Sequence, residues 1–429
     1  MTARTASAGR DRASYLRDVC RLLWPAPAEA VLVPARPAAA RPVDQPGNAS
    51  GERGDSSMLV LPGLRQPRLV VPRDRRPGSA AVRRYGEPAS ARTRLAARAL
   101  SATLASGLGD LVLRDRILIR VPPGAQTIES HLSSVLGQRV QVSIHLGAAR
   151  ANRKPVLQLL TPSGQTVGFA KVGVNPLTAG LVRAEHEALG RLAAAGLTGL
   201  KVPRALDLSR WHGMDVLVLS PLPAWLKRTP LRPGQLEDAM AEVAHVGGVH
   251  YTPLTASDYW HRLAARLHDA CDGRDDADGE HAALRAAIGH LAVMAGATPL
   301  SFGSWHGDWT PWNMACTRAG LLVWDWERFT VGAPIGFDAL HYWLQAEVVP
   351  GRRDPAQAAA DCVRRSAALL EPLGVAPPRA RLTALAYLAD LSVRYLADRQ
   401  EQAGAPLGAP RRWLLPALAA AVNGQPGTD

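Results

Sequence analysis

Residues 305–313 read WHGDWTPWN, and residues 321–327 read LLVWDWE. These two stretches decide the fold, because they interrupt an otherwise helical half of the chain with turn residues and one short apolar strand. Asp308 precedes Asn313 by five residues, and a second aspartate, Asp325, follows the strand. A turn of this kind can direct Asp308 and Asn313 into one pocket, which Asp325 can close from the other side.

The residue types in this pattern suit phosphoryl transfer. Such a reaction needs a carboxylate that orients the attacking hydroxyl and accepts its proton, and oxygen ligands that hold Mg²⁺ against the phosphates. Mg²⁺ prefers carboxylate, carbonyl and water oxygens. Turn formation by Asp308 and Asn313 and helix capping by Asp325 would explain each residue singly. They would not explain the joint occurrence of the three.

The motif His-Gly-Asp-x-x-x-x-Asn at 306–313, with an aspartate 12 residues further on, resembles the aminoglycoside phosphotransferase and choline kinase group of kinase-like enzymes. In that group the first aspartate is the catalytic carboxylate, and the asparagine and the second aspartate bind Mg²⁺. The resemblance therefore implies that Asp308 is catalytic, that Asn313 and Asp325 are metal ligands, and that Mg-ATP is the phosphate donor. It also implies that His306 braces the catalytic loop.

The resemblance continues beyond the motif. Glu327 and residues 332–338 also look like that family's continuation, and Asp338 is expected to cap the next helix. Trp309 and Trp312 stand where smaller or polar residues are common. Stacking on a sugar in the acceptor pocket and packing in the core are equally open for these two rings.

A front lobe contributes the predicted nucleotide-binding residues. Lys171 lies in a strand with apolar flanks. A kinase needs a lysine there to contact the nucleotide phosphates, held by a glutamate of the following helix. Glu185 and Glu187 are both candidates for that glutamate. Glu185 precedes Leu192 by seven residues, which resembles the family's helix pattern better, so we choose Glu185. The loop 146–152 is expected to cover the phosphates.

Composition and periodicity divide the chain into four regions. Residues 1–57 are predicted to be a mostly disordered basic tail, although a short helix at 15–23 has one apolar face and its docking is open. Residues 58–137 are expected to form a small α+β module. Residues 138–224 are expected to be an N-lobe of antiparallel strands that binds nucleotide, and 225–429 a helical C-lobe with the catalytic loop, metal and acceptor site. We expect an α+β, two-lobed, protein-kinase-like fold with an extra N-terminal module.

The net charge of +13 is unevenly distributed. Residues 1–235 hold 34 basic against 15 acidic side chains, whereas 236–350 hold 6 against 15. The basic excess lies in the Pro- and Arg-rich N-terminal portion, which contains no recognisable nucleic-acid-binding motif. Nucleic acid is therefore not expected as a partner. The acidic excess would suit a cationic acceptor such as an aminosugar. Neutral sugars stay open, because the acid cluster 272–280 is expected to be an exposed loop.

The cellular location follows from apolar runs and cysteines. The longest apolar runs, such as 413–422, have about half of the ~20 residues that a spanning helix needs, so no membrane partner is expected. Residues 1–25 contain no apolar stretch of signal-peptide length. The four cysteines lie far apart without a CxxC pair, which fits free thiols in a reducing compartment. We therefore expect a cytoplasmic protein.

Together these patterns predict an ATP-dependent phosphotransferase. It would move the γ-phosphate to a hydroxyl of a small-molecule acceptor, which is a sugar, an aminosugar or aminoglycoside, or an amino alcohol. The alternative is a catalytically silent kinase-like binding or scaffold protein. Pseudo-enzymes usually lose at least one site residue, so the presence of all five predicted ones argues against silence: Lys171, Glu185, Asp308, Asn313 and Asp325.

Overall fold

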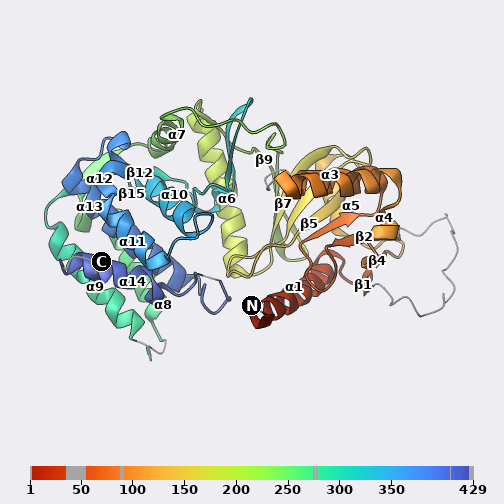
Figure 1. The fold of residues 1–429 in the computed structure, drawn as a ribbon, viewed down its shortest axis with the longest axis horizontal. Helices are drawn as coiled ribbons and strands as arrows, with labels where there is room; N and C mark the ends of the chain where they lie inside the picture. The colour runs from red at the N-terminus through yellow and green to blue at the C-terminus, as the bar shows by residue number, and fades with distance from the viewer. Residues whose placement is uncertain are drawn as a thin grey trace. The chain divides into compact units, whose positions relative to one another are not determined.

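The chain folds into two compact units, which are described separately (Figure 1). The structure is a computed structural model, and it describes residues 2–34, 55–86, 91–273, 276, 279–405 and 407–424. The first, the sheet unit, comprises residues 1–149, 153–179 and 206–221. The second, the helical unit, comprises residues 150–152, 180–205 and 222–429.

A nine-stranded sheet forms the centre of the sheet unit. Its strand order is β1-β4-β2-β3-β5-β6-β7-β10-β9, and the pairings from β1 to β10 are antiparallel. The strands are β1 Glu29–Val33, β2 Ser56–Leu61, β3 Leu69–Pro72, β4 Arg116–Arg120, β5 Gln141–His145, β6 Val156–Leu160, β7 Thr166–Gly173, β9 Ala205–Trp211 and β10 Met214–Leu219.

Helices cover both faces of this sheet, and the alternation of apolar residues along β2 shows how. Met58 and Val60 pack in one core with α1 (Thr2–Leu23) and α5 (Ile128–Leu136). Leu59 and Leu61 point the other way and pack in a core that includes residues of α2 and α3. Successive side chains of a strand point to opposite faces, so one strand can supply both cores. The helices of the second face are α2 Arg75–Gly86 and α3 Ala91–Ser106, followed by the short α4 Gly109–Val112.

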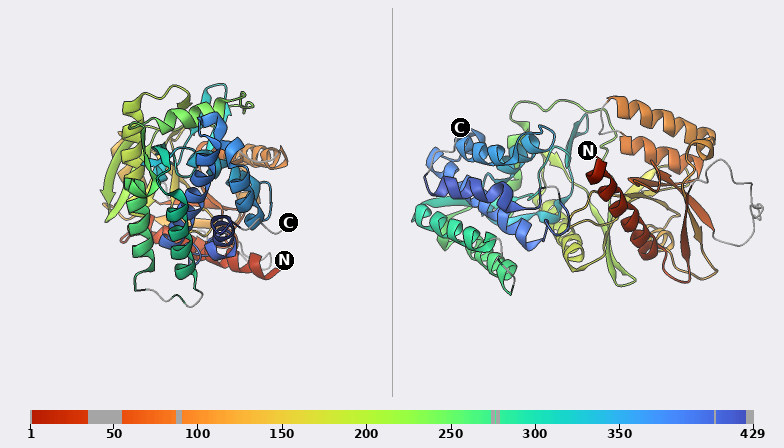
Figure 2. Two further views of the ribbon diagram at one scale, coloured as in Figure 1. Left: turned by 90° about the vertical axis from the view of Figure 1, so that its left-hand side faces the viewer. Right: turned by 60° about the horizontal axis from the view of Figure 1, so that its bottom comes forward.

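The N-terminus differs from the predicted disordered tail at 1–57. Helix α1 lies along the sheet (Figure 2). Leu16, Val19 and Leu23 of α1 are fully buried in the core that the helix shares with the sheet, and Nε1 of Trp24 donates a hydrogen bond to Oε2 of Glu129 over 3.0 Å. The apolar residues of α1 recur at helical spacing, so one stripe faces the core. The strand β1 then pairs with β4. The prediction extended the Pro and Gly content of the later part to most of this segment. Its one exception was the short helix at 15–23, which lies within α1 and whose docking was left open. Residues 35–54 lie outside the described part.

The segment expected to be a separate module, 58–137, shares its sheet with the expected N-lobe at 138–224. Strand β3 pairs with β5 across that boundary, with Leu69 opposite His145. The same hydrophobic core also contains residues from both sides of the boundary. The structure therefore places both segments in one unit.

The helical unit packs its helices around α13 (Pro377–Ala397), which buries thirteen of its residues. This antiparallel sheet unit and mainly helical second unit confirm the expected α+β class. The remaining helices are α7 Gln235–Ala244, α8 Asp258–Cys271, α9 Glu280–Ala295, α10 Phe337–Val348, α11 Pro355–Arg364, α12 Ser366–Leu370 and α14 Leu414–Val422. The helix α6, Pro176–Ala195, falls in the sheet unit up to Ala179 and in the helical unit from Gly180. Within the described ranges, no helix has both the length and the apolar character required to cross a membrane.

Two three-stranded sheets in the helical unit position the motif residues. In the first, of order β11-β12-β15, the central strand leads directly into His306. In the second, of order β13-β14-β8, the hairpin follows Asn313 and ends before Asp325. Its two ends are tied by a hydrogen bond of 3.0 Å from Trp324 N to the carbonyl of Asn313. The strands are β8 Leu200–Lys201, β11 His250–Pro253, β12 Pro299–Trp305, β13 Met314–Thr317, β14 Gly320–Val323 and β15 Thr330–Pro334.

Candidate active site

The loop between β12 and β13 holds its shape through a glycine and a buried carboxylate. Gly307 has φ +84°, and a Cβ added there would overlap the carbonyl oxygen of Arg328, so a side chain is excluded on two grounds. The carboxylate of Asp338 accepts hydrogen bonds from His306 N at 2.7 Å and from Gly307 N at 3.2 Å. The expected capping role of Asp338 is wrong, because α10 begins after Gly336 without a side-chain cap. Asp338 stabilises the loop instead.

His306 connects the loop to the end of β14. Its Nδ1 accepts a hydrogen bond from Asp308 N at 3.1 Å, and its Nε2 lies 3.0 Å from the carbonyl oxygen of Trp324. An imidazole that accepts at Nδ1 and donates at Nε2 is neutral. Burial lowers the pKa of His306 to about 4, so this form persists at neutral pH. His306 therefore braces the loop, as the resemblance implies.

Asp308 is held by two side chains while its own side chain stays 33 % exposed. Nδ2 of Asn313 donates to the carbonyl oxygen of Asp308 at 2.9 Å and to its Oδ2 at 3.0 Å. His341 lies 3.1 Å from Oδ1. Desolvation alone would raise the pKa of Asp308. The hydrogen bond from His341 and the positive charge of Arg394 outweigh this effect and lower the pKa below its usual value. The carboxylate is thus ionised and oriented.

Three carboxylates gather beside this loop within the helical unit. Oxygens of Glu185, Asp325 and Glu327 all lie within 4.8 Å of one another. Glu185 and Glu327 are buried, so their charges repel in a medium that screens poorly. Three carboxylates at this spacing suit a hard divalent cation, because such cations bind oxygen ligands. The arrangement can therefore hold Mg²⁺.

Asp325 occupies its place through an unusual backbone conformation. It has φ 74° and ψ 53°, the left-handed region, directly before the 3₁₀ turn η2 (Trp326–Arg328). Aspartate enters this region more readily than most residues, and strained positions of this kind cluster at functional sites. The structure brings Asp325 to Glu185 and Glu327, whereas Asn313 directs its amide nitrogen to Asp308. A metal would bind the other atom of that amide, Oδ1.

The predicted nucleotide residues lie in different units. Lys171 is buried on β7, in register with Val156 of β6 and Leu217 of β10. Glu185 is fully buried in the helical unit, and its Oε1 accepts a hydrogen bond of 3.2 Å from Trp326 N. The structure thus places Glu185 among the metal-binding candidates. Its pairing with Lys171 stays a prediction.

The tip of the loop 146–152 belongs to the helical unit. Nδ2 of Asn152 donates to Oε1 of Glu327 at 3.2 Å, and Ala151 N donates to Oε1 of Gln400 at 3.3 Å. The tip therefore contacts a carboxylate of the cluster through a side chain. Its role as a cover over nucleotide phosphates stays a prediction.

The two tryptophans of the motif have different environments. Trp309 is fully buried, with ring centroids 5.7 Å from His306 and 6.3 Å from Trp326, so it packs the core beneath the loop. Trp312 is 37 % exposed. Of the two open interpretations, core packing holds for Trp309, and an exposed ring suited to contact an acceptor remains for Trp312.

Two side chains near the loop were not in the predicted site set. Glu327 had a detectable signal, since an acid two residues after Asp325 lies on the same turn. His341 had none, because it lies 33 residues after Asp308 on another helix and reaches the site only through the fold.

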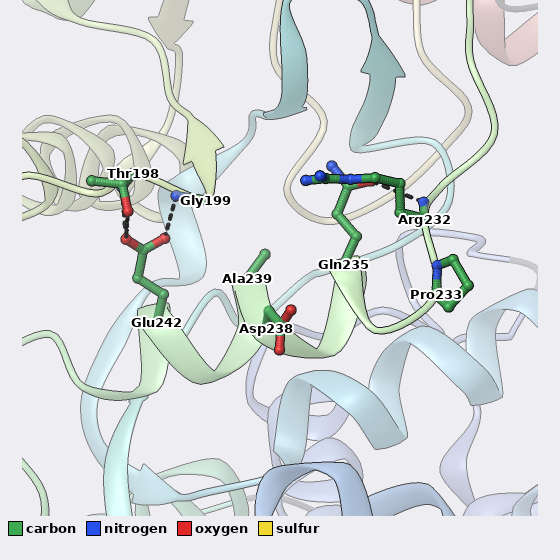
Figure 3. A pocket seen from close by; sticks show the side chains of 8 residues that line it. All are labelled: Thr198, Gly199, Arg232, Pro233, Gln235, Asp238, Ala239 and Glu242. Carbon is green, nitrogen blue, oxygen red and sulfur yellow. Dashed lines mark hydrogen bonds between the residues drawn. The ribbon is translucent and has the colours of Figure 1, made fainter.

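The helical unit also contains a pocket of about 410 Å³ between the segment after α6 and the start of α7 (Figure 3). Glu242 forms one of its walls and accepts hydrogen bonds from Thr198 N at 2.6 Å and Gly199 N at 2.8 Å. The full lining is Thr198, Gly199, Arg232, Pro233, Gln235, Asp238, Ala239 and Glu242. It includes none of the predicted site residues.

Comparison with known proteins gives one family match. The model of the phosphotransferase enzyme family matches residues 171–373, a range that contains all five predicted site residues. This match confirms the resemblance predicted from the motif at 306–313. A comparison with curated proteins finds no match.

Several solved structures are similar at low identity. One is a thermostable mutant of aminoglycoside phosphotransferase APH(4)-Ia in a ternary complex with ADP and hygromycin B, at 15% identity and TM-score 0.47, covering 71% of this chain and 100% of that one. ADP-bound aminoglycoside phosphotransferase APH(2'')-Ib has 13% identity and TM-score 0.40, with 68% and 97% covered. A choline/ethanolamine kinase family protein from Mesorhizobium loti has 15% identity and TM-score 0.36, with 64% and 90% covered.

Proposed function

We propose that this protein, whose residues 171–373 match the phosphotransferase enzyme family, moves the γ-phosphate of ATP to a hydroxyl of a small molecule. The observation that carries the proposal is the state of Asp308. Its carboxylate is partly exposed, ionised and held by Asn313 and His341, while a three-carboxylate cluster lies in the same unit. These are the parts that phosphoryl transfer requires.

Asp308 acts on the acceptor hydroxyl in this proposal. Its ionised oxygen accepts a hydrogen bond from the hydroxyl and orients the hydroxyl oxygen towards the γ-phosphorus. It takes the proton as the new P–O bond forms and the bond from the γ-phosphorus to the bridging oxygen of ADP breaks, so that ADP leaves. The pKa of Asp308 lies below its usual value, so it is a weak base. A weak base suffices, because the transition state of phosphoryl transfer is loose and needs positioning more than early proton removal.

Asn313 and the carboxylate cluster form the proposed metal site. Asn313 and Asp325 are the ligands that we expected, and Glu327 and Glu185 add two buried carboxylates. A bound Mg²⁺ supplies positive charge that neutralises the nucleotide phosphates. Asn313 would fix the position of the metal relative to Asp308, because its amide also donates a hydrogen bond to the carboxylate of Asp308.

Lys171 is proposed to contact the nucleotide phosphates, with ATP as the donor. Its position on β7 and its burial support this role. The family match begins at this residue.

The acceptor is proposed to be a sugar, an aminosugar or an amino alcohol. The acidic excess in residues 236–350 supports a cationic acceptor, and the half-exposed ring of Trp312 supports stacking on a sugar face. We further propose a cytoplasmic location. The four cysteines are thiols rather than disulfides in the structure, which supports a reducing compartment.

A screen of ADP release tests the proposal. Purified protein and Mg-ATP are combined with sugars, aminoglycosides and amino alcohols, and each hit is checked for a phosphorylated product by mass spectrometry. At least one acceptor is expected to stimulate ADP release in the native protein and not in Asp308→Asn. Stimulation of equal size in both proteins would contradict the role of Asp308. Binding of Mg-ATP with no stimulation by any acceptor would favour the silent alternative.

A further inference from the structure

A buried line of hydrogen bonds ends at the carboxylate of Asp308. His341 on α10 is 1 % exposed, and its Nε2 lies 3.1 Å from Oδ1 of Asp308. Its other ring nitrogen, Nδ1, lies 2.9 Å from the hydroxyl oxygen of Tyr387 on α13. Tyr387 is fully buried. The line thus starts inside the helical core and reaches the one group to which we assign the proton transfer.

Counting hydrogens gives the direction of both bonds. A carboxylate only accepts, so Nε2 of His341 carries a hydrogen and donates it to Asp308. In a neutral imidazole Nδ1 is then an acceptor, and it takes the hydroxyl hydrogen of Tyr387. Burial lowers the pKa of His341 and raises that of Tyr387 well above its ordinary value. Both side chains therefore keep these protonation states at neutral pH.

The bond from His341 completes a clamp on the carboxylate. Asn313 donates to Oδ2 at 3.0 Å and His341 faces Oδ1 at 3.1 Å. The terminal torsion of an aspartate is soft, so one donor alone leaves the plane of the carboxylate poorly defined. Two donors on different oxygens define that plane. Each oxygen retains acceptor capacity for a further hydrogen bond, because an ionised carboxylate offers about four lone-pair sites.

Charged groups from other elements surround the clamp. Arg394 of α13 donates to the carbonyl oxygen of Gly307 and faces Asp308. The charge of Asp325 acts to raise the pKa of Asp308, and the charge of Asp308 in turn acts to raise the pKa of Asp338. Among the residues that the structure describes, none of these charged groups forms a hydrogen bond with Oδ1 of Asp308. His341 therefore supplies the orientation at that oxygen.

We propose that His341 is a positioning residue: its Nε2–H, braced by Tyr387, holds Oδ1 of Asp308 in the orientation that receives the acceptor hydroxyl. This inference rests on the proposed function. His341 neither gains nor loses a proton in the reaction, because its Nδ1 already accepts from Tyr387 and the proton of the acceptor hydroxyl goes to Asp308. The competing interpretation is that His341 merely fills space between α10 and α13.

Three substitutions separate positioning from space filling. His341→Gln keeps an N–H near the place of Nε2, His341→Leu keeps bulk without a donor, and Tyr387→Phe removes only the brace. ADP release from Mg-ATP is measured with the best acceptor of the screen and with water alone. His290→Leu, at an exposed position of α9, is the matched control.

His341→Leu is expected to lower kcat about 10- to 100-fold, since misplacement of about 1 Å can cost that much, with KM for ATP and the melting temperature near native values. His341→Gln is expected to restore most of the lost kcat. Tyr387→Phe is expected to lose less than about tenfold in kcat, because it removes one neutral hydrogen bond. Unchanged kcat in His341→Leu would overturn the inference. Equal loss in His341→Leu and His341→Gln, with a falling melting temperature, would establish space filling and also overturn it.

A second measurement needs no variant to fold. Nitrogen NMR of the histidine rings in the native protein is expected to show His341 neutral with hydrogen on Nε2, and hydrogen on Nδ1 instead would overturn the inference. Asp308→Asn in the same assay separates the two levels of argument. If Asp308→Asn keeps full turnover, the proposed function itself fails. If it is inactive while His341→Leu is fully active, only the positioning role fails.

Discussion

The part of the sheet unit formed by α1, β2 and β4, here called the front, and the loop 306–327 are stabilised by different kinds of interaction. The front is stabilised by apolar burial, because α1, β2 and β4 contribute to one hydrophobic core. The loop is stabilised by buried hydrogen bonds, in which the side chains of Asp338, His306 and His341 each use two atoms. Apolar burial gives stability with little demand on geometry, whereas a polar network sets the orientation of individual atoms.

This difference predicts that changes in the loop affect activity and changes in the front affect stability. Asp308→Asn should lower turnover roughly 10²–10⁴-fold, because a positioned base is lost. Nucleotide affinity and melting temperature should stay near native values, since asparagine preserves the shape. Titration with Mg-ATP and ADP release measure the two quantities, and Asp238→Asn at an exposed position is the control. If Asp308→Asn lost turnover because its melting temperature fell, the proposed difference between the loop and the front would be contradicted.

The matching change in the front is Leu16→Ala. Leu16 is fully buried in the core beneath α1, so its truncation should reduce the free energy of unfolding by about 2–5 kcal/mol. The catalytic constants measured well below the melting temperature should not change. Leu95→Ala on α3, where the side chain is 70% exposed, serves as the control. A Leu16 variant as stable as the Leu95 variant would mean that α1 does not dock in solution.

Asp325→Ala sharpens the comparison at the metal site. Removal of a proposed ligand should weaken Mg²⁺-dependent nucleotide binding about tenfold or more and abolish turnover. The thermal stability without Mg²⁺ should hold or rise, because one of three mutually repelling carboxylates is gone. Nucleotide titration with and without Mg²⁺ and melting curves in chelator give both results. A variant with native Mg²⁺-dependent affinity would exclude Asp325 as a ligand.

Glu129→Gln should have the smallest effect and tests charge within the apolar front. Burial raises the pKa of Glu129. The hydrogen bonds that its carboxylate accepts from its own backbone, Trp24 and Thr127 lower the pKa, but by less. A carboxyl with a raised folded pKa contributes stability below its unfolded pKa, and that contribution is lost as pH rises through the folded pKa. Glutamine keeps an acceptor for Trp24 and carries no charge.

The variant should therefore be slightly more stable than the native protein at neutral pH, by less than about 1 kcal/mol. The two should converge as the pH falls below the unfolded pKa of glutamate. Melting curves between pH 4 and pH 8 measure the difference. A gap that widens towards acid pH would contradict the assigned sign.

The contrast also explains what could be predicted from the sequence. Alternation indicated antiparallel strands in 138–224 and helical spacing indicated a mainly helical segment at 225–429, because apolar burial leaves a periodic pattern. The motif at 306–313 indicated Asp308, Asn313 and Asp325 through their spacing. Only the part of α1 at 15–23 was predicted as a helix, with its docking left open, because its apolar residues sit beside Pro- and Arg-rich sequence and disorder was assigned to the rest.

Remote polar partners leave no such pattern. His341 and Tyr387 reach Asp308 because α10 and α13 pack together, and neither residue has a spacing that marks it. Asp338 was found in the sequence but given the wrong partner, since an aspartate near a helix start usually caps it. Its carboxylate instead accepts hydrogen bonds from two backbone N–H groups, which lie 31 and 32 residues earlier in the chain. Such pairings depend on the complete fold.

The order of the strands has a consequence for synthesis of the chain. Strand β1 ends at Val33 and pairs with β4, which is complete only at Arg120. At about 5–20 residues per second, the ribosome makes the partner roughly 4–17 s after β1. During that interval the apolar stripe of α1 has no finished sheet to cover it. A chaperone that binds emerging apolar helices should therefore meet this chain early, and slowing translation between β1 and β4 should increase aggregation more than slowing it after β10.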